Sequence, residues 1–109
     1  MALSPSEVNA RVTRFIERLR RQVPVHAVYL FGSYVAGTAD DASDIDLAVV
    51  SPEFGRNRHE ELAILSRSRL PDAVEIEALP FSERELREMP PGSFLREIVR
   101  TGRLIHADT

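Results

Sequence analysis

Two short pieces of sequence, LFGSYVAG at residues 30–37 and SDIDL at residues 43–47, decide how this chain folds. An almost unbroken apolar run, Val25 to Phe31, leads into the first piece and predicts a buried central strand. Gly32 and Ser33 end that strand, and the residues after them have room for only a turn or two of helix. A Gly-Ser pair at such a junction presents backbone N–H groups and a hydroxyl to an anion, although the same pair is more often a plain turn.

The second piece carries two carboxylates, Asp44 and Asp46, at the start of a predicted strand over residues 44–50. Residues two apart on a strand project from the same face, and two like charges side by side are unfavourable unless something neutralises them. A hard divalent cation such as Mg²⁺, bound by carboxylates and substrate phosphates, would do so. The alternative is that Asp44 lies in a solvated loop and Asp46 is exposed at a sheet edge. The apolar run that follows, residues 47–50, makes this alternative less attractive.

A third predicted strand repeats the same feature. The segment Val74 to Leu79 alternates apolar and acidic residues, so Glu75 and Glu77 share one face. If this strand lies beside the second, one of the two glutamates can join Asp44 and Asp46 in a three-carboxylate site. Such a triad suits two-metal phosphoryl or nucleotidyl transfer, in which two carboxylates hold the ions and the third orients or deprotonates an acceptor hydroxyl. The alternative is a strand with a solvated acidic face.

Helical periodicity surrounds these strands. A helix is predicted over about residues 5–22, with Ser4 as its N-cap and a capping box completed by Glu7. Further predicted elements are helices over 57–69, over 82–89 and over 93–101, the last with Gly102 as its C′ residue, and a short edge strand over 104–106. The pattern predicts an α/β (α+β) chain that forms one domain over residues 1–109.

Composition limits the classes of function. The 109 residues carry a net charge of −3 and no Cys, which excludes a disulfide framework, a thiolate zinc site and a cysteine nucleophile. No apolar run reaches the roughly 18 residues of a membrane span, and the N-terminal segment lacks the apolar core of a secretory signal. The default expectation is a soluble cytoplasmic domain. The acidic balance argues against a nonspecific DNA-binding surface, although residues 1–24 hold five Arg against two Glu.

Other side chains have two interpretations each. Tyr34 either lines a nucleotide site or packs in the interior, and the arginines around the third predicted helix either touch a triphosphate or, as is favoured, lie on a solvated helix face. These arginines are Arg56, Arg58, Arg67 and Arg69. The spacing of His26, His59 and His106 does not indicate a shared metal site. We expect Phe15, Phe31 and Phe81 in the core, whereas Phe94, Ile98 and Leu104 either pack on the sheet or form a surface for a partner.

The combination of these pieces resembles a known family. Phe31-Gly32-Ser33 and, after ten further residues, Asp44-Ile45-Asp46-Leu47 resemble the signature of the polymerase-beta-like nucleotidyltransferase superfamily. Within it the chain is similar to stand-alone minimal nucleotidyltransferase (MNT) domains. The clear match covers residues 28–50, and agreement in the order of elements extends to about residue 106. The resemblance implies a nucleotidyltransferase fold with a mixed sheet of three to four strands packed against helices.

The resemblance also implies roles for individual residues. Gly32 and Ser33 would contact the nucleotide phosphates, and Asp44 and Asp46 would bind Mg²⁺, with two ions expected. The third acid of the family, a metal-binding and catalytic residue, lies on a later strand. Glu77 is the choice here, because Ile76-Glu77 followed by Pro80-Phe81 looks like the corresponding segment of relatives, and Glu75 remains the alternative.

By resemblance, the function would be Mg²⁺-dependent transfer of AMP from ATP to a hydroxyl group. Stand-alone relatives commonly pair with a helical HEPN toxin, act as its antitoxin and modify a tyrosine on it. A HEPN-type partner is therefore expected here, with a homo-oligomer as a further option and with neither DNA nor a membrane as a partner. The family usually has Asp where Glu77 stands, and Glu is one methylene longer. This departure and the short chain motivate a second hypothesis, a non-catalytic binding module that neutralises a partner by contact.

Overall fold

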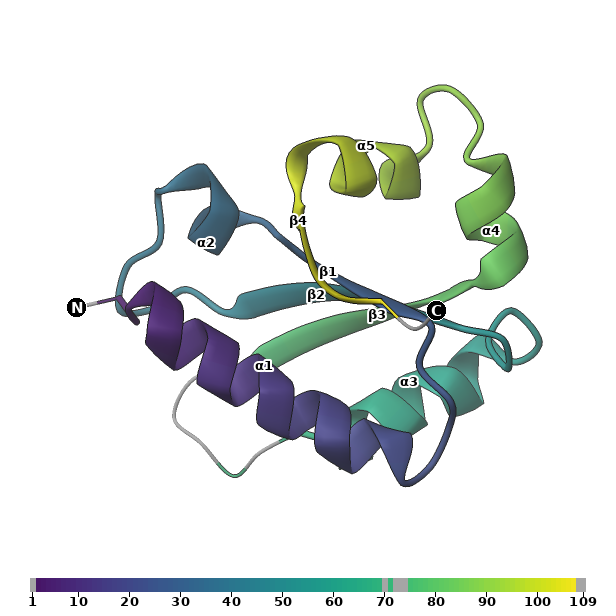
Figure 1. Cartoon of the computed structure of the whole chain (residues 1–109), viewed down its shortest axis with the longest axis horizontal. Coiled ribbons are helices and arrows are strands. Elements are labelled where there is room, and N and C mark those ends of the chain that lie inside the picture. The colour runs from purple at the N-terminus through teal and green to yellow at the C-terminus, as the bar shows by residue number, and fades with distance from the viewer. Residues whose placement is uncertain (1, 70, 72–74, 108–109) are drawn as a thin grey trace.

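The computed structural model, which describes residues 2–69, 71 and 75–107, has one four-stranded mixed sheet with helices on both faces (Figure 1). The elements in chain order are α1 (Pro5–Arg20), β1 (Ala27–Phe31), α2 (Ser33–Ala36), β2 (Ile45–Ser51), α3 (Arg58–Arg67), β3 (Ile76–Ser82), α4 (Glu83–Glu88), α5 (Phe94–Thr101) and β4 (Arg103–Ala107). The strand order is β3-β2-β1-β4, in which β2 and β3 are parallel and the other two pairs antiparallel. The α+β class with a mixed sheet is therefore confirmed.

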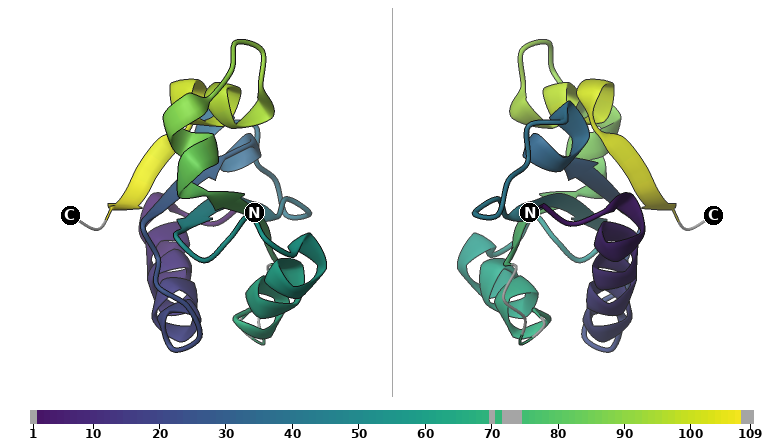
Figure 2. Two further views of the ribbon diagram at one scale, coloured as in Figure 1. Left: turned by 90° about the vertical axis from the view of Figure 1, so that its right-hand side faces the viewer. Right: turned by 90° about the vertical axis from the view of Figure 1, so that its left-hand side faces the viewer.

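Alternation along the strands gives the sheet two different faces. The first face packs against α1 and α3 through Val28, Leu30, Ile45, Leu47, Val49 and Ile76, which are almost fully buried. The second face packs against α4 and α5 through Ala27, Ala48, Val50 and Phe81. Figure 1 shows α1 and α3 below the sheet and α2, α4 and α5 above it, and the two side views in Figure 2 agree. Among the described helices, none has both the length and the apolar character needed to cross a bilayer.

The first helix follows the predicted pattern closely. Ser4 and Glu7 form the capping box, and the buried stripe is Val8, Val12, Phe15, Ile16 and Leu19. The helix ends at Arg20, two residues before the predicted end, because the Arg21 N–H already turns back to the Arg18 and Leu19 carbonyls.

The third strand is longer than predicted. We expected it to end at Leu79, before Pro80, yet β3 continues through Pro80 to Ser82, where a second capping box starts α4. Proline has no N–H to donate, but β3 is an edge strand, so one side of its backbone has no neighbour in the sheet. The predicted first residue of this strand, Val74, lies outside the described residues.

Gly102 ends α5 as predicted, but for a different reason. A C′ glycine normally adopts a left-handed conformation, whereas Gly102 has φ −84° and extended backbone. A Cβ built there would lie 2.5 Å from the Ile98 carbonyl oxygen and 2.6 Å from that of Leu30. The glycine is therefore needed because the chain passes close to two backbone groups as it leaves α5 for β4.

A buried glutamate holds the loop before α3. The Glu61 side chain is 6% exposed, and its carboxylate accepts N–H bonds of 2.9–3.1 Å from Gly55, Arg56 and Asn57. Burial alone would raise the pKa of Glu61, but the three backbone bonds and the Arg58 charge outweigh it and hold the pKa below its ordinary value. Apolar periodicity does not predict this arrangement, in which an acid is buried and its neighbour Leu62 is 38% exposed.

Replacing Glu61 by Ala is expected to lower the free energy of unfolding by about 2–4 kcal/mol, because three backbone N–H groups lose a charged acceptor and the loop that they hold loses its anchor. The exposed neighbour Glu60 is the matched control, and Glu60→Ala should cost less than about 1 kcal/mol. Because folding lowers the pKa of Glu61, its stabilisation is full above the ordinary value of 4.5 and is lost as pH falls through the folded value. Urea unfolding at pH 7 and at several acidic pH values measures both effects. Equal losses for the two variants at neutral pH would contradict the assignment.

Candidate active site

Two glycines with positive φ flank α2, the short helix that follows β1. Gly32 caps α2 at φ 82°, ψ −152°, a region that is essentially restricted to glycine, and Gly37 ends the helix in the left-handed conformation at φ 80°. Ser33 is the first helical residue. The first N–H groups of any helix have no partner within it, so this turn offers donors at the end of β1.

The loop between α2 and β2 is held by its own side chains. Asp40 accepts an N–H bond from Ala42 at 2.9 Å, and the Ser43 hydroxyl accepts one from the Asp40 N–H at 2.9 Å. Asp40 therefore belongs to the loop rather than to the carboxylate group that follows. The Ile45 N–H then bonds to the Glu75 carbonyl at 2.9 Å, which joins the starts of β2 and β3.

The sheet register brings the predicted acids together. Asp46 is the cross-strand partner of Phe31 on β1 and of Glu77 on β3. Paired residues point to the same face, and the neighbours of Asp46 in alternation, Ala48 and Val50, belong to the face that α4 and α5 cover. The carboxylates therefore lie on the second face, at the end of the sheet next to α2. We call Phe31, Asp46 and Glu77 the site row.

Three of the acids form a group with the spacing of metal ligands. One carboxylate oxygen each from Asp44, Glu75 and Glu77 lies within 4.8 Å of the others. Two oxygens on opposite sides of one Mg²⁺ are about 4.2 Å apart, so small side-chain adjustments would let this group hold such an ion. The structure thus brings both glutamates to the site. Glu75 is also within 3.7 Å of Arg69, whose charge partly neutralises it.

Asp46 stands slightly apart from that group and lies against the glycine turn. A Cβ added to Gly32 would overlap Asp46 Oδ2 and lie 3.1 Å from Asp46 Cγ, so the carboxylate occupies the space that any other residue at position 32 would need. Partial burial raises the pKa of Asp46 above its ordinary value, and the charges of Asp44 and Glu77 raise it further. Concentrated negative charge of this kind, made only of oxygen donors, fits a hard divalent cation.

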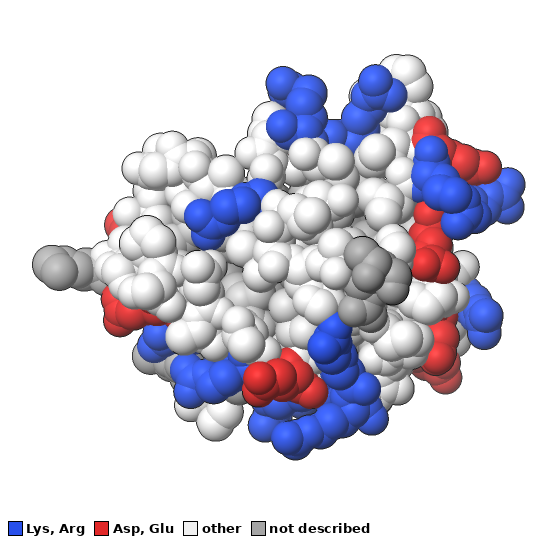
Figure 3. Space-filling model, viewed as in Figure 1, with Lys and Arg blue, Asp and Glu red and all other residues white. Residues whose placement is uncertain are grey.

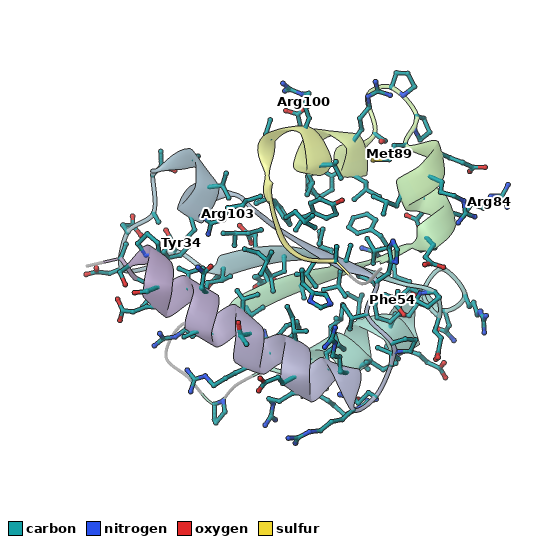
Figure 4. The ribbon with its side chains drawn as sticks, in the orientation of Figure 1. Tyr34, Phe54, Arg84, Met89, Arg100 and Arg103 are labelled. Carbon is teal, nitrogen blue, oxygen red and sulfur yellow. The ribbon has the colours of Figure 1, made fainter. Side chains whose placement is uncertain are left out.

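The structure also shows where the side chains lie for which the sequence left two possible roles. Tyr34 packs toward α1, where its hydroxyl accepts the Leu3 N–H at 3.2 Å, so this partly buried side chain packs against the core (Figure 4). Three of the four arginines, Arg56, Arg58 and Arg67, are exposed as expected. The fourth, Arg69, lies beside the acidic group. Its location at the end of a helical pattern in the sequence does not predict this contact.

The arginines of α1 lie on the face of the sheet opposite the site acids. Figure 3 shows arginines along the lower edge of the molecule, over α1, with acidic side chains among them. The exposed arginines of this helix and its cap are Arg14, Arg18, Arg20 and Arg21. α1 covers the first face and the site acids lie on the second, where α4 and α5 also carry arginines, namely Arg84, Arg87, Arg96 and Arg100.

Comparison with known proteins identifies the family of the chain. The nucleotidyltransferase domain family matches residues 12–101. A curated protein of Haemophilus influenzae, named as the probable protein adenylyltransferase MntA, is 37% identical over 82 residues. That alignment spans 75% of this chain and 66%, or just under two thirds, of the relative.

Solved structures share the fold. A nucleotidyltransferase-fold protein of Sulfolobus solfataricus gives a TM-score of 0.67 at 20% identity, over 91% of this chain and 79% of that one. A toxin–antitoxin complex with AMP-PNP gives 0.58 at 26% identity, and a mutant MntA–HpeT toxin–antitoxin complex gives 0.56 at 24%. Each of these two alignments covers 89% of this chain and 73% of the other.

Proposed function

This chain belongs to the nucleotidyltransferase domain family, and on that premise we propose that it transfers AMP from ATP to a hydroxyl group in a Mg²⁺-dependent reaction. The observation that carries the proposal is the convergence of the acids on the glycine turn. Asp46 lies against Gly32, pairs with Glu77 across the sheet and is under the electrostatic influence of Asp44. An anion-binding turn beside a group of cation-binding oxygens suits a metal-bound triphosphate.

We assign the binding roles as follows. The N–H groups at Gly32 and Ser33 and the Ser33 hydroxyl bind phosphate oxygens, and Gly32 allows a phosphate to approach the backbone closely. Asp44, Asp46 and Glu77 would hold Mg²⁺, with two ions expected. When bound, Mg²⁺ would neutralise charge on the triphosphate and polarise the α-phosphate.

In the reaction, the acceptor hydroxyl oxygen forms a bond to the α-phosphorus, and the bond from that phosphorus to the pyrophosphate oxygen breaks. The hydroxyl proton goes to a carboxylate, for which we propose Glu77 because it stands at the solvent-exposed end of the site row. The products are a phosphodiester on the acceptor and pyrophosphate.

We further propose that the acceptor is a tyrosine on a helical HEPN-type partner and that this chain is the antitoxin of the pair. Support comes from the relative named as a protein adenylyltransferase and from the similar toxin–antitoxin complex with AMP-PNP.

The test uses ATP labelled on either the α- or the γ-phosphate, with the chain and the protein that co-purifies with it. Nucleotidyl transfer moves the α label to the partner and leaves the γ label in pyrophosphate. Transfer of the γ label would indicate a kinase reaction, and no transfer with an intact partner complex would overturn the proposal. If Asp46→Asn still suppresses the toxicity of the partner, neutralisation by contact is the better explanation.

The two glutamates of β3 are separable by mutation. We expect Glu77→Gln to slow transfer on the order of 100-fold or more, because Glu77 is the partner of Asp46 in the sheet. Glu75→Gln should slow it less than about tenfold, because Arg69 already shares the Glu75 charge. Initial rates at saturating ATP compare the two variants. The opposite order would make Glu75 the third functional acid.

A further inference from the structure

Phe94, the first residue of α5, is more exposed than any other large apolar side chain in the described ranges. Its exposed fraction is 56%, compared with 51% for Leu104 and 38% for Leu62. The next apolar residues of the helix, Leu95 and Ile98, are buried against the sheet. The core therefore does not account for the position of Phe94.

The aromatic ring is held in place next to the site row. The rings of Phe94 and Phe31 meet edge to face, with centroids 5.7 Å apart and planes at 89°. Phe31 immediately precedes Gly32 and is the cross-strand partner of Asp46. Phe31, which we expected in the core, is itself only partly buried. Phe94 thus contacts Phe31, and Phe31 in turn adjoins both the glycine turn and the Asp46 carboxylate.

Open space borders Phe94 on two sides. A surface hollow of about 440 Å³ is lined by Phe94 together with Gly92, Ser93, Arg96, Glu97 and Arg100. A second hollow, of about 380 Å³, lies between α4 and α5 and is lined by Phe94 and by Phe81, Glu85, Pro90 and Leu95 among others. Phe94 lines both hollows, and each is large enough for a planar ring system.

We propose that Phe94 is the stacking platform for the base of the nucleoside triphosphate whose phosphates bind at Gly32 and Ser33. This inference rests on the proposed function, because it needs the phosphates at that turn. A nucleotide anchored there extends from the site row, and the Phe94 ring is the exposed aromatic surface beside that row. Stacking tolerates any base, because every base has a π-face, so Phe94 contributes affinity rather than choice of base.

The experiment distinguishes the contribution of the base to binding from that of the phosphates. Binding of Mg²⁺–ATP and of Mg²⁺–tripolyphosphate is measured by calorimetry for the wild type, Phe94→Ala and Phe94→Leu. Leucine keeps apolar contact with Phe31 but cannot stack, so it covers the case in which the alanine variant folds poorly. We expect both variants to weaken ATP binding by about 5- to 150-fold and to leave tripolyphosphate binding unchanged. Leu104→Ala, at a similarly exposed apolar residue on β4, should change neither.

A fluorescence measurement gives a second readout, because the chain contains no Trp. Phe94→Trp introduces a single reporter that should retain ATP affinity and be quenched by ATP but not by tripolyphosphate. Leu104→Trp is the matched control and should respond to neither. If the wild type binds tripolyphosphate but the Phe94 variants bind ATP normally, or lose both ligands equally, the stacking role is wrong and the phosphate site stands. If the wild type binds neither ligand, the proposed function fails as well.

Discussion

Asp46→Asn is expected to slow nucleotidyl transfer on the order of 10³-fold and, in the absence of metal, to make the chain more stable than the wild type. The loss of activity follows from the removal of a charged oxygen ligand. The gain in stability follows from the position of Asp46, because partial burial and the charges of Asp44 and Glu77 raise its pKa in the folded state. A carboxyl whose pKa is raised on folding destabilises the folded state once pH rises above its ordinary value of 3.8. Asparagine has nearly the same shape and no charge.

Thermal unfolding with and without Mg²⁺, together with the labelled-ATP assay, measures both effects. Added Mg²⁺ should raise the Tm of the wild type, because an ion that binds only the folded state stabilises it, and should raise that of Asp46→Asn much less. Asp40→Asn is the matched control, since Asp40 belongs to the loop and asparagine can still accept the Ala42 N–H. A Tm for metal-free Asp46→Asn below that of the wild type, or near-normal transfer, would contradict this assignment.

The acids of the site could be predicted from sequence because their signal is local. Asp44 and Asp46 share a face through strand alternation alone, and an acidic strand that is otherwise apolar indicates that something must compensate the charge. The pairing of Asp46 with Glu77 needs only that β2 and β3 be neighbours. The Gly-Ser pair is recognisable from sequence as a break in the strand, although its interpretation as a phosphate site depends on the acids that follow after ten further residues.

Other features depend on contacts between segments that are distant in the sequence, so no local sequence pattern predicts them. Glu61 is buried because a loop folds its backbone N–H groups over the carboxylate, whereas apolar periodicity assigns acids to the surface. β3 passes through Pro80 because it is an edge strand, and strand order is not encoded in the strand itself. Phe94 had two interpretations from sequence, and only the register of β1 and the placement of α5 bring it beside Phe31.

The sequence predicts Gly32 for its backbone freedom, and the structure adds a second constraint, the close contact with the Asp46 carboxylate. Gly32→Ala should lower the free energy of unfolding by about 3–5 kcal/mol, because the substitution forces a side chain into a glycine-only conformation and into the Asp46 carboxylate. Gly37→Ala is the matched control. It also has positive φ, but a Cβ there meets nothing within 4 Å, so it should cost only about 1–2 kcal/mol.

A double-mutant cycle separates the collision from the backbone strain. In an Asp46→Ala background the carboxylate is gone, so Gly32→Ala should cost only the strain, about 1–3 kcal/mol, and the difference from its cost in the wild type is the coupling between the two positions. Urea unfolding of the four proteins measures it. Equal costs in the two backgrounds would mean that Asp46 does not occupy the space beside Gly32. A positive coupling would support the close approach that the proposed site requires, in which the glycine turn and the acid that it contacts face one triphosphate together.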